Sequence, residues 1–352
     1  MIDWTRTMKR SFKFYKVDPI TWKNLKPLDT IKSCNFNRDK TKSTLGSGTF
    51  DTTTDMEECY IRVYLVVVQD GVTYDIPLIT LLAQPAADGF DGKTRNVSMD
   101  AYTSLVELKS SPPPIGYALL KGDNIMDMAS RLCRENMRAP VVAAKCDDTL
   151  KSHFVSNLDD DWLLFISDLI NVAKYEFDLD EMGRVLFKPV QDVASLQPVW
   201  SYNDDNSSIL LPDIDDDRDL YDIPNIVEVV YSTGTAYMYS RVVNDDKNSP
   251  ISTVNRGYEK VRRITDPSFT GVPSQQDIDD YAVRVLRNLS CLEHTVTYTH
   301  GYCPVKVGDC VLLNYKRFGL VNVKAQVISQ SFTCTTDCLV EETAVYTRRL
   351  WR

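Results

Sequence analysis

Two pairs of side chains that can bind a metal stand near the C-terminus at short spacings. His300 and Cys303 are separated by two residues, and Cys334 and Cys338 are separated by three. Zinc is typically held by closely spaced ligand pairs on tight turns, and Pro304 favours a turn beside the first pair. The alternative, which we favour, is that each pair simply lies at the end of a strand and that the two strands are unrelated. We predict no metal or other cofactor, with His300, Cys303, Cys334 and Cys338 as weak zinc candidates.

A run of carboxylates could provide a second kind of site. Calcium prefers several hard oxygen ligands, but an EF-hand loop starting at Asp213 would need glycine and glutamate where the chain has Arg218 and Pro224. We interpret the run as a solvated acidic loop that projects negative potential, with a calcium-dependent binding module as the alternative. Eight of the nineteen residues from position 204 to 222 are aspartates: Asp204, Asp205, Asp213, Asp215, Asp216, Asp217, Asp219 and Asp222.

The chain has few groups suited to catalysis. Its three histidines are His153, His294 and His300, and it contains neither a Gly-x-Ser-x-Gly elbow nor a His-Glu-x-x-His motif. The segment Gly89–Thr94 has two residues between its glycines where a phosphate-binding loop has four, so we predict a surface turn. A carboxylate pair for glycoside hydrolysis stays open among 49 acidic residues. We predict that the protein is not an enzyme.

Composition and charge limit the kinds of molecule that the protein is expected to bind. The 352 residues carry a net charge of −9, which argues against stable binding to nucleic acid, although five basic residues fall within positions 6–16. The longest apolar run, Tyr64–Val68, has the length of a strand, so we expect no membrane-spanning helix and no stable membrane association. Nine cysteines without a secretory signal indicate reduced core thiols, and a disulfide framework is the alternative.

The elements that must position these residues change character twice along the chain. Residues 1–110 read as antiparallel strands, with Asp70–Gly71 as a hairpin turn. Residues 111–197 read as α+β, with one helix capped by Asp123 and another capped by the trio Asp159–Asp161, followed by a hairpin over 175–187. Residues 198–352 return to strands, interrupted by a helix over about 274–290. We expect these later strands at 226–231, 237–243, 259–264, 293–299, 310–315, 321–332 and 338–346.

The order of several turn motifs resembles that of the bacteriophage baseplate and tail hub family, which includes the late-control D proteins and the N-terminal half of type VI secretion spike proteins. In that pattern a strand leads to an Asn-Asp, Ser-Pro loop, a helix is inserted, and a Val-x-x-Gly-Asp turn re-enters the barrel. The segments that carry the resemblance are Asp222–Tyr231, Tyr239–Thr253, Asn255–Gly257, Pro304–Asp309 and, for the exit from the first β segment, Ser98–Leu105.

The resemblance implies an α+β, mainly β fold with two tube-like antiparallel β-barrels around an α+β domain. It also implies a homotrimer in which two barrels per chain form a pseudo-sixfold ring in the virion, assembled in the host cytoplasm. The ring would contact the tail tube or distal tail protein, the tape-measure protein and the central spike or fibre, and DNA would pass through without staying bound. We expect the acidic loop to face this channel.

The resemblance also sharpens the alternatives. Larger relatives continue into a spike, fibre or lytic module, whereas this chain stops at Trp351–Arg352, so we expect any cell-wall-cutting function on a separate polypeptide. The runner-up functions are a tail-associated cell-wall hydrolase and a calcium-dependent receptor-binding module.

Overall fold

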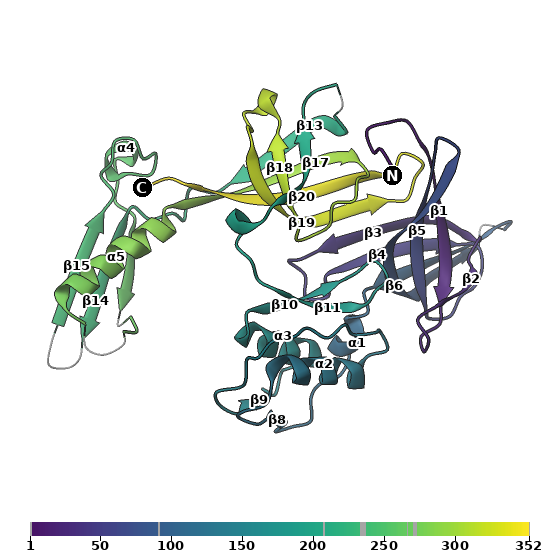
Figure 1. Cartoon of the computed structure of the whole chain (residues 1–352), viewed down its shortest axis with the longest axis horizontal. Helices are drawn as coiled ribbons and strands as arrows, with labels where there is room; N and C mark the ends of the chain where they lie inside the picture. The colour runs from purple at the N-terminus through teal and green to yellow at the C-terminus, as the bar shows by residue number, and fades with distance from the viewer. Residues whose placement is uncertain are drawn as a thin grey trace. The chain divides into compact units, whose positions relative to one another are not determined.

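The chain forms two compact units and passes between them more than once. The computed structural model describes residues 2–90, 92–206, 208–232, 237–265, 267–269 and 273–351. The first unit contains the chain up to Ile214 together with Tyr298–Ala344, and the second contains Asp215–Thr297 together with Val345–Arg352. The unit boundary therefore falls within three strands, β13, β17 and β20, which Figure 1 labels.

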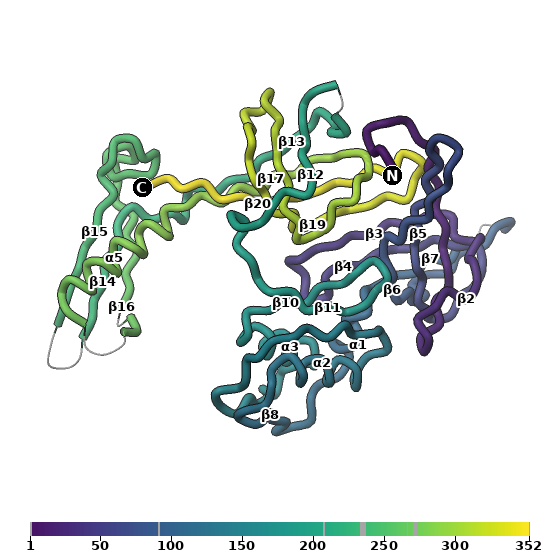
Figure 2. Tube along the Cα trace, in the orientation of Figure 1, coloured from purple at the N-terminus to yellow at the C-terminus, as the bar shows by residue number. Residues whose placement is uncertain are grey.

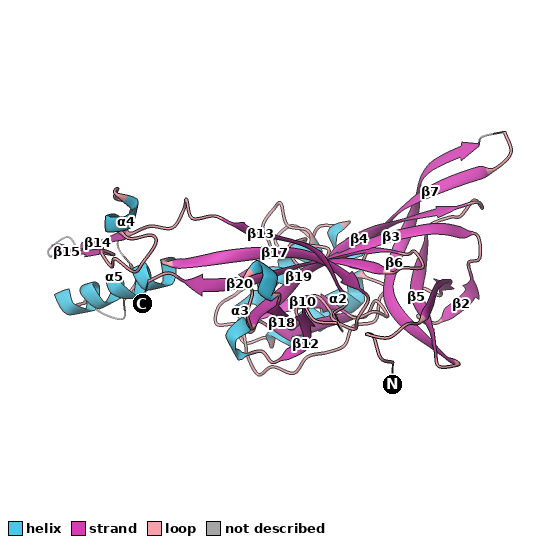
Figure 3. Cartoon of the chain, turned by 90° about the horizontal axis from the view of Figure 1, so that it is seen from above, coloured by secondary structure: helices cyan, strands magenta, loops and turns pink. Residues whose placement is uncertain are grey.

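Strands dominate the structure, as the magenta ribbons of Figure 3 show, so the predicted mainly β class is confirmed. In the described chain the largest sheet has the strand order β13-β17-β20-β19-β3-β4-β7-β6-β5-β1-β2, while β18 pairs with β19 and β12 pairs with β18. The bounds of these strands are β1 (Lys9–Val17), β2 (Asn24–Pro27), β3 (Ile31–Asp39), β4 (Gly46–Thr52), β5 (Cys59–Gln69), β6 (Val72–Phe90), β7 (Arg95–Tyr102), β12 (Pro198–Asn203), β13 (Leu210–Arg218), β17 (Cys291–Gly301), β18 (Cys310–Asn314), β19 (Val323–Thr333) and β20 (Leu339–Arg349).

The N-terminal and C-terminal strands join where β3 pairs antiparallel with β19. The rings of Phe36 on β3 and Phe332 on β19 stack here with centroids 4.5 Å apart, and Figure 2 shows the two traces side by side. Tyr302 and Val340 belong to the same core as the N-terminal strands. Among the described strands no sheet closes on itself, so the predicted two-barrel arrangement is not confirmed. Pairing between β3 and β19 instead unites the two sets of strands in one open sheet.

Helices and a hairpin fill the middle of the first unit. The elements are α1 (Val106–Lys109), β8 (Ala118–Leu119), α2 (Ile125–Asn136), β9 (Phe154–Val155), α3 (Trp162–Val172), β10 (Tyr175–Leu179), β11 (Val185–Pro189) and the 3₁₀ turn η1 (Val193–Ser195). Their core contains Leu132 and Phe165 from the helices together with Trp22 and Tyr60 from the N-terminal segment. The helical part is thus packed against the first β segment through large apolar side chains.

Local turn and cap chemistry explains where most of these elements begin. Asp70 and Gly71 have φ of 50° and 80° and connect β5 to β6, which confirms the predicted hairpin. Asp161 caps α3 as expected, and β10 pairs with β11 in the predicted hairpin. The predicted cap of α2 is wrong by one residue. Asn124 accepts the N–H of Asp127 as the cap, while the Asp123 carboxylate instead accepts the N–H of Leu120.

The second unit contains a three-stranded sheet with a helix on one face. Strand β14 (Ile226–Ser232) pairs antiparallel with β15 (Tyr237–Val243) and parallel with β16 (Val261–Thr265). Helix α5 (Gln275–Leu289) starts at the predicted capping box of Ser274 and Asp277. A short helix, α4 (Thr253–Arg256), and a 3₁₀ turn of the first unit, η2 (Lys316–Phe318), complete the elements. None of the described helices is both long and apolar enough to span a bilayer.

Burial of the α5 stripe should hold the second unit together. Leu286 is fully buried against Val227 and Val229 of β14, so a carboxylate in its place would lose its hydration. We expect Leu286→Asp to destabilise the second unit by about 3–5 kcal/mol in urea unfolding followed by circular dichroism. The matched control is Asn288→Asp, which adds the same group at an exposed position of the same helix and should change stability by less than about 1 kcal/mol. Equal effects of the two variants would contradict this packing.

Candidate functional site

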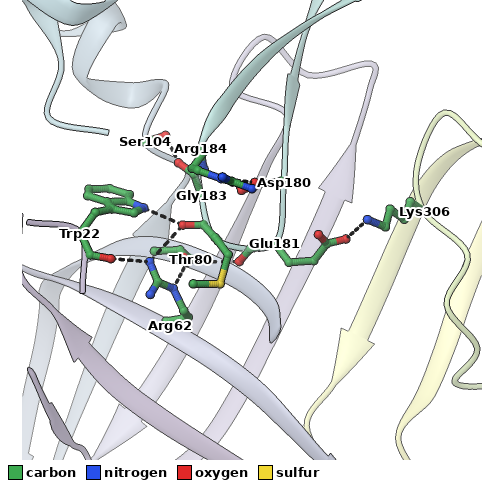
Figure 4. Close-up of polar contacts among 10 residues, drawn as sticks. Trp22, Arg62, Thr80, Ser104, Asp180, Glu181, Gly183, Arg184 and Lys306 are labelled. Atoms are coloured by element: carbon green, nitrogen blue, oxygen red, sulfur yellow. Dashed lines mark hydrogen bonds and ion pairs between the residues drawn. The ribbon is translucent and has the colours of Figure 1, made fainter. Parts of the chain in front are cut away.

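The turn of the β10–β11 hairpin lies against the N-terminal strands, as Figure 4 shows. In this turn the N–H of Gly183 donates to the carbonyl oxygen of Asp180 at 2.9 Å. The Met182 carbonyl oxygen accepts hydrogen bonds from Nε1 of Trp22 at 2.6 Å and from Nη2 of Arg62 at 3.1 Å. One backbone carbonyl of the α+β segment is thus an acceptor for two side chains of the first β segment.

Arg62 on β5 is a positive charge in the interior, with 1% of its surface exposed. Its Nε donates to Oγ1 of Thr80 at 2.9 Å, and its Nη1 donates to Oδ1 of Asn24 at 2.8 Å. Its Nη2 also donates to the carbonyl oxygen of Trp22 at 3.3 Å. Burial lowers the pKa of Arg62, but a guanidinium stays protonated at neutral pH. The charge is therefore stabilised by neutral oxygens, which replace the water removed on folding.

The close approach of the turn requires glycine at position 183. Gly183 has a φ of +75°, and a Cβ there would lie 2.8 Å from Cβ of Thr80 and 3.3 Å from Cζ2 of Trp22. The Thr80 hydroxyl also donates to the carbonyl oxygen of Glu181 at 3.2 Å. The backbone conformation of Gly183 and the hydrogen bond from the Thr80 hydroxyl together hold the turn against β6.

The same turn reaches the C-terminal β segment through Glu181. Its carboxylate lies 2.7 Å from Nζ of Lys306, which belongs to the predicted Val-x-x-Gly-Asp turn (Figure 4). Burial alone would raise the pKa of Glu181, but the hydrogen bond from Lys306 and the charges of Lys306 and Arg38 hold it below its ordinary value. The hairpin turn is thus bonded to both β segments of the first unit, which makes it the junction of three parts of the chain.

A cavity of about 360 Å³ lies beside this junction, lined by β10, β11, β3 and the segment before β18. Opposite charges meet on its walls, with Lys40 and Glu176 2.5 Å apart and Lys188 and Asp178 2.6 Å apart. Burial raises the pKa of Asp309, another lining residue. A general acid needs a carboxyl group with a raised pKa. The raised pKa of Asp309 is therefore the observation that supports the alternative of a hydrolase.

A second polar cluster is buried between β12, β17 and β20. His300 donates from Nδ1 to the carbonyl oxygen of Gly301 at 2.7 Å, and its Nε2 lies 3.0 Å from the Tyr202 hydroxyl and 3.4 Å from Oε2 of Glu342. The Tyr298 hydroxyl donates to Oε1 of Glu342 at 2.5 Å. His300 and Glu342 are both fully buried, so they form an ion pair without contact to solvent.

Electrostatics keeps this cluster charged at neutral pH. Burial lowers the pKa of His300, but hydrogen bonds to Cys303 and Glu342 and the Glu342 charge outweigh it and raise the pKa to about 10. Burial and the Glu342 charge also raise the pKa of Tyr202 and Tyr298, so both hydroxyls stay protonated and can donate. Sequence reasoning missed Tyr202 and Glu342, because no local motif links residues so far apart in the chain.

The structure brings two of the four weak zinc candidates together, His300 and Cys303. Nδ1 of His300 lies 3.9 Å from Sγ of Cys303 within the buried cluster. Cys334 instead lies beside Cys34, to whose carbonyl oxygen its backbone N–H donates at 2.9 Å, and Cys338 is buried in the core of the N-terminal strands. Within the described ranges, no group of three or more histidine, cysteine, aspartate or glutamate side chains is placed to hold a metal ion.

The acidic run is not the loop that the sequence predicts. Asp213, Asp215, Asp216 and Asp217 lie on β13, the outermost strand at one end of the sheet. The loop interpretation was wrong there because aspartate has a low strand propensity, whereas β13 is fixed by pairing with β17. Alternation leaves Asp213, Asp215 and Asp217 exposed and directs Asp216 to His294, whose Nδ1 lies 2.9 Å from its carboxylate.

The other aspartates of the run lie in the connections on either side of β13. The Asp204 carboxylate accepts the N–H of Arg317, and the Asp219 carboxylate accepts the N–H of Tyr221. The Asp222 carboxylate lies 3.2 Å from Nζ of Lys260. Asp205 takes part in contacts as well. The run therefore combines structural carboxylates with three that project to solvent from one face of a strand.

Removing the guanidinium at the hairpin junction should weaken the first unit. We expect Arg62→Met to destabilise it by about 3–4 kcal/mol, because the Met182 carbonyl and the Thr80 hydroxyl lose a buried donor. The matched control is Arg184→Met, which removes a half-exposed ion pair with Asp180 and should cost less than about 1 kcal/mol. Urea unfolding measures both variants, and similar losses would show that Arg62 does not anchor the turn.

The buried ion pair should make stability depend on pH in a defined window. The folded-state pKa of His300, about 10, lies above its ordinary value of 6.5, so its contribution is complete below pH 6.5 and is lost as pH rises toward 10. We expect the loss to be on the order of a few kcal/mol. Urea unfolding at pH 6, 8 and 10 measures it.

Glu342→Gln provides the comparison for this pH dependence. Without the carboxylate, the unfolding free energy should fall by about 3–5 kcal/mol at pH 6, because a buried cation loses its partner. The difference between the original chain and the variant should then shrink between pH 6.5 and 10. A difference that stays constant across this range would mean that His300 is not charged in the folded protein.

Solved structures with the same fold identify the architecture. No family model matches the chain, and no curated protein matches its sequence. The tail protein from Neisseria meningitidis MC58 superimposes with a TM-score of 0.63 at 12% identity, covering 97% of this chain and 98% of that one. The 43 kDa tail protein of prophage MuSo2 from Shewanella oneidensis gives 0.63 at 10% identity, covering 95% and 98%.

A chain of the Francisella PdpA–VgrG complex is similar over a more limited part of its own length. It gives a TM-score of 0.55 at 8% identity and covers 96% of this chain but 53% of that one. This chain therefore spans about half of that protein and nearly all of the two tail proteins. At the level of the fold, its resemblance to the bacteriophage baseplate and tail hub family is confirmed.

Proposed function

We propose that this protein is the structural hub of a bacteriophage tail tip or baseplate, which joins the tail tube to the central spike and lets DNA pass. The observation that carries the proposal is the match to two tail proteins over almost the full length of both partners. A shared single domain would say little about role, since one fold can host many functions. Agreement over the whole chain supports a common structural role in the tail.

The hub would be a ring of three chains. Each chain would supply two tube-lining β segments, residues 1–110 and 198–352, which correspond to the two barrels expected from the sequence, with the α+β segment 111–197 between them. Three chains then present six similar positions, which adapts a sixfold tube to a threefold spike. The hairpin junction supports this arrangement, because it bonds to both β segments of the first unit and so limits their independent movement.

Charge supports a channel through which DNA moves without binding. Three copies at −9 each give a ring of −27. Asp213, Asp215 and Asp217 are exposed along one face of β13, and we propose that this face lines the channel. A negative wall repels phosphates, so the genome would slide past it.

The neighbours of the hub follow from its position in the tail. The tail tube or distal tail protein would bind on one side, the central spike or fibre on the other, and the tape-measure protein in the channel. The chain would assemble in the host cytoplasm and remain in the virion. We propose that it carries out no catalysis and holds no cofactor.

Imaging of tail particles tests the proposal. We expect the purified chain to form a species of about 120 kDa by native mass spectrometry, three times 40.1 kDa, or to become trimeric at tube ends. Electron cryomicroscopy of particles with a labelled chain should place it in a threefold ring at the tail tip, because the ring must match the spike. A label along the tail shaft, or its absence from particles, would rule the hub out.

A clearing assay tests the enzymatic alternative separately. The purified chain is added to a peptidoglycan suspension, and we expect no loss of turbidity. Asp309→Asn is the informative variant, because Asp309 is the cavity carboxyl with a raised pKa. Clearing by the original chain that disappears in this variant would establish a hydrolase instead.

A further inference from the structure

Two cysteines face each other where the N-terminal and C-terminal strands join. The pairing of β3 with β19 places Phe332 opposite Phe36 and Thr333 opposite Asn35. Extending this register by one residue places Cys334 opposite Cys34. The backbone N–H of Cys334 donates to the carbonyl oxygen of Cys34 at 2.9 Å, so the pairing continues past the end of β19. Residues opposite each other in antiparallel strands have Cα atoms about 4.5–5.5 Å apart, within the range of about 4.4–6.8 Å that a disulfide bridges.

The two thiols also point to the same side of the sheet. Side chains alternate along a strand, so Cys34 shares the face of Phe36, and Cys334 shares the face of Phe332. Those two rings stack almost parallel at 13°, which shows that both residues face one core. Cys34 is buried in that core and Cys334 is packed against it. The neighbouring Cys34 thiol, together with burial, raises the pKa of the Cys334 thiol, in agreement with this placement.

A third thiol lies near this pair. Cys338 follows four residues after Cys334 and is buried in the same core. Burial raises its pKa to about 12, against the opposing charge of Arg10. Arg10 donates from Nη1 to the carbonyl oxygen of Asp337 at 2.7 Å, which holds the β19–β20 turn in place. Cys338 directly precedes β20, the neighbour of β19 in the sheet, so it is the competing partner for Cys334 that the experiment must distinguish.

We propose that Cys34 and Cys334 form a modification site, a disulfide that closes after the protein leaves the reducing cytoplasm. The step from a reducing to an oxidising environment depends on the proposed function as a virion protein. The placement of the two thiols does not depend on that proposal. Two S–H bonds break and one S–S bond forms. Dissolved dioxygen accepts the two electrons and two protons and becomes hydrogen peroxide. Formation is slow while the thiols are buried and protonated, since the thiolate is the reacting form.

The bond would change the topology of the first unit. It closes a loop of about 300 residues between positions 34 and 334, and loops of this length restrict the unfolded chain most strongly. It also makes the joint between β3 and β19 covalent, where non-covalent contacts, among them hydrogen bonds and the stacked rings, hold it in the reduced protein. A particle outside the cell would then keep its two β segments together under conditions that separate paired strands.

Peptide mapping tests the site on the purified chain and on particles. The chain is incubated with oxidised glutathione, free thiols are blocked with N-ethylmaleimide, and a non-reducing digest is analysed by mass spectrometry. We expect a peptide linking Cys34 to Cys334 that disappears on reduction, and a rise in Tm of about 5–10 °C on oxidation. Complete alkylation of both cysteines, or a link from either one to Cys338, would overturn the proposal.

Serine variants provide the controls. Cys34→Ser and Cys334→Ser should each abolish the rise in Tm on oxidation, and using both guards against one failing to fold. Cys146→Ser removes a thiol elsewhere in the first unit and should keep the full rise. A rise that persists in either of the first two variants would contradict the site. The experiment on the purified chain does not depend on tail particles. A linked peptide found there would support the disulfide even if imaging showed that the chain is not part of the tail.

Discussion

A buried guanidinium determines how the first unit holds together. Arg62 can remain charged in the interior only because neutral oxygens from separate segments converge on it, among them the carbonyl of Met182. That carbonyl is available only if the hairpin turn approaches closely, which in turn requires glycine at position 183. The ion pair between Glu181 and Lys306, which lowers the pKa of Glu181, connects the same turn to the C-terminal β segment of this unit. The relation between the three sequence segments of this unit therefore depends on satisfying one charge.

A second constraint acts among β12, β17 and β20. His300 and Glu342 are an ion pair that solvent does not reach, and two tyrosines and a glutamine complete its hydrogen bonds. Both polar groups sit among strands that carry the chain toward the second unit, whereas the apolar core around Phe36 and Phe332 lies at the joint between β3 and β19. Directional polar contacts thus reinforce the register that burial of one face of these strands already favours.

Local chemistry made part of this structure predictable. The Asp70–Gly71 hairpin, the Asp161 cap and the Ser274–Asp277 capping box are each encoded by neighbouring residues, and all three are present. What failed depends on distant partners. β13 is a strand because β17 pairs with it, although its aspartates favour a loop. The two predicted barrels are not confirmed: among the described strands β3 pairs with β19 in one open sheet, and no sequence pattern within either strand indicates the other as its partner. His300 was recognised as notable, but its partner Glu342 is 42 residues away.

The pairing of β3 with β19 also has a consequence for biosynthesis. Strand β3 is complete at Asp39, but its partner β19 begins only at Val323. At a synthesis rate of about 5–20 residues per second, the β3 edge waits on the order of 15–60 s for its neighbour. During that time the edge of β3 that does not pair with β4 is open to association with other nascent chains. Newly made protein should therefore depend on chaperones that shield strand edges until translation ends.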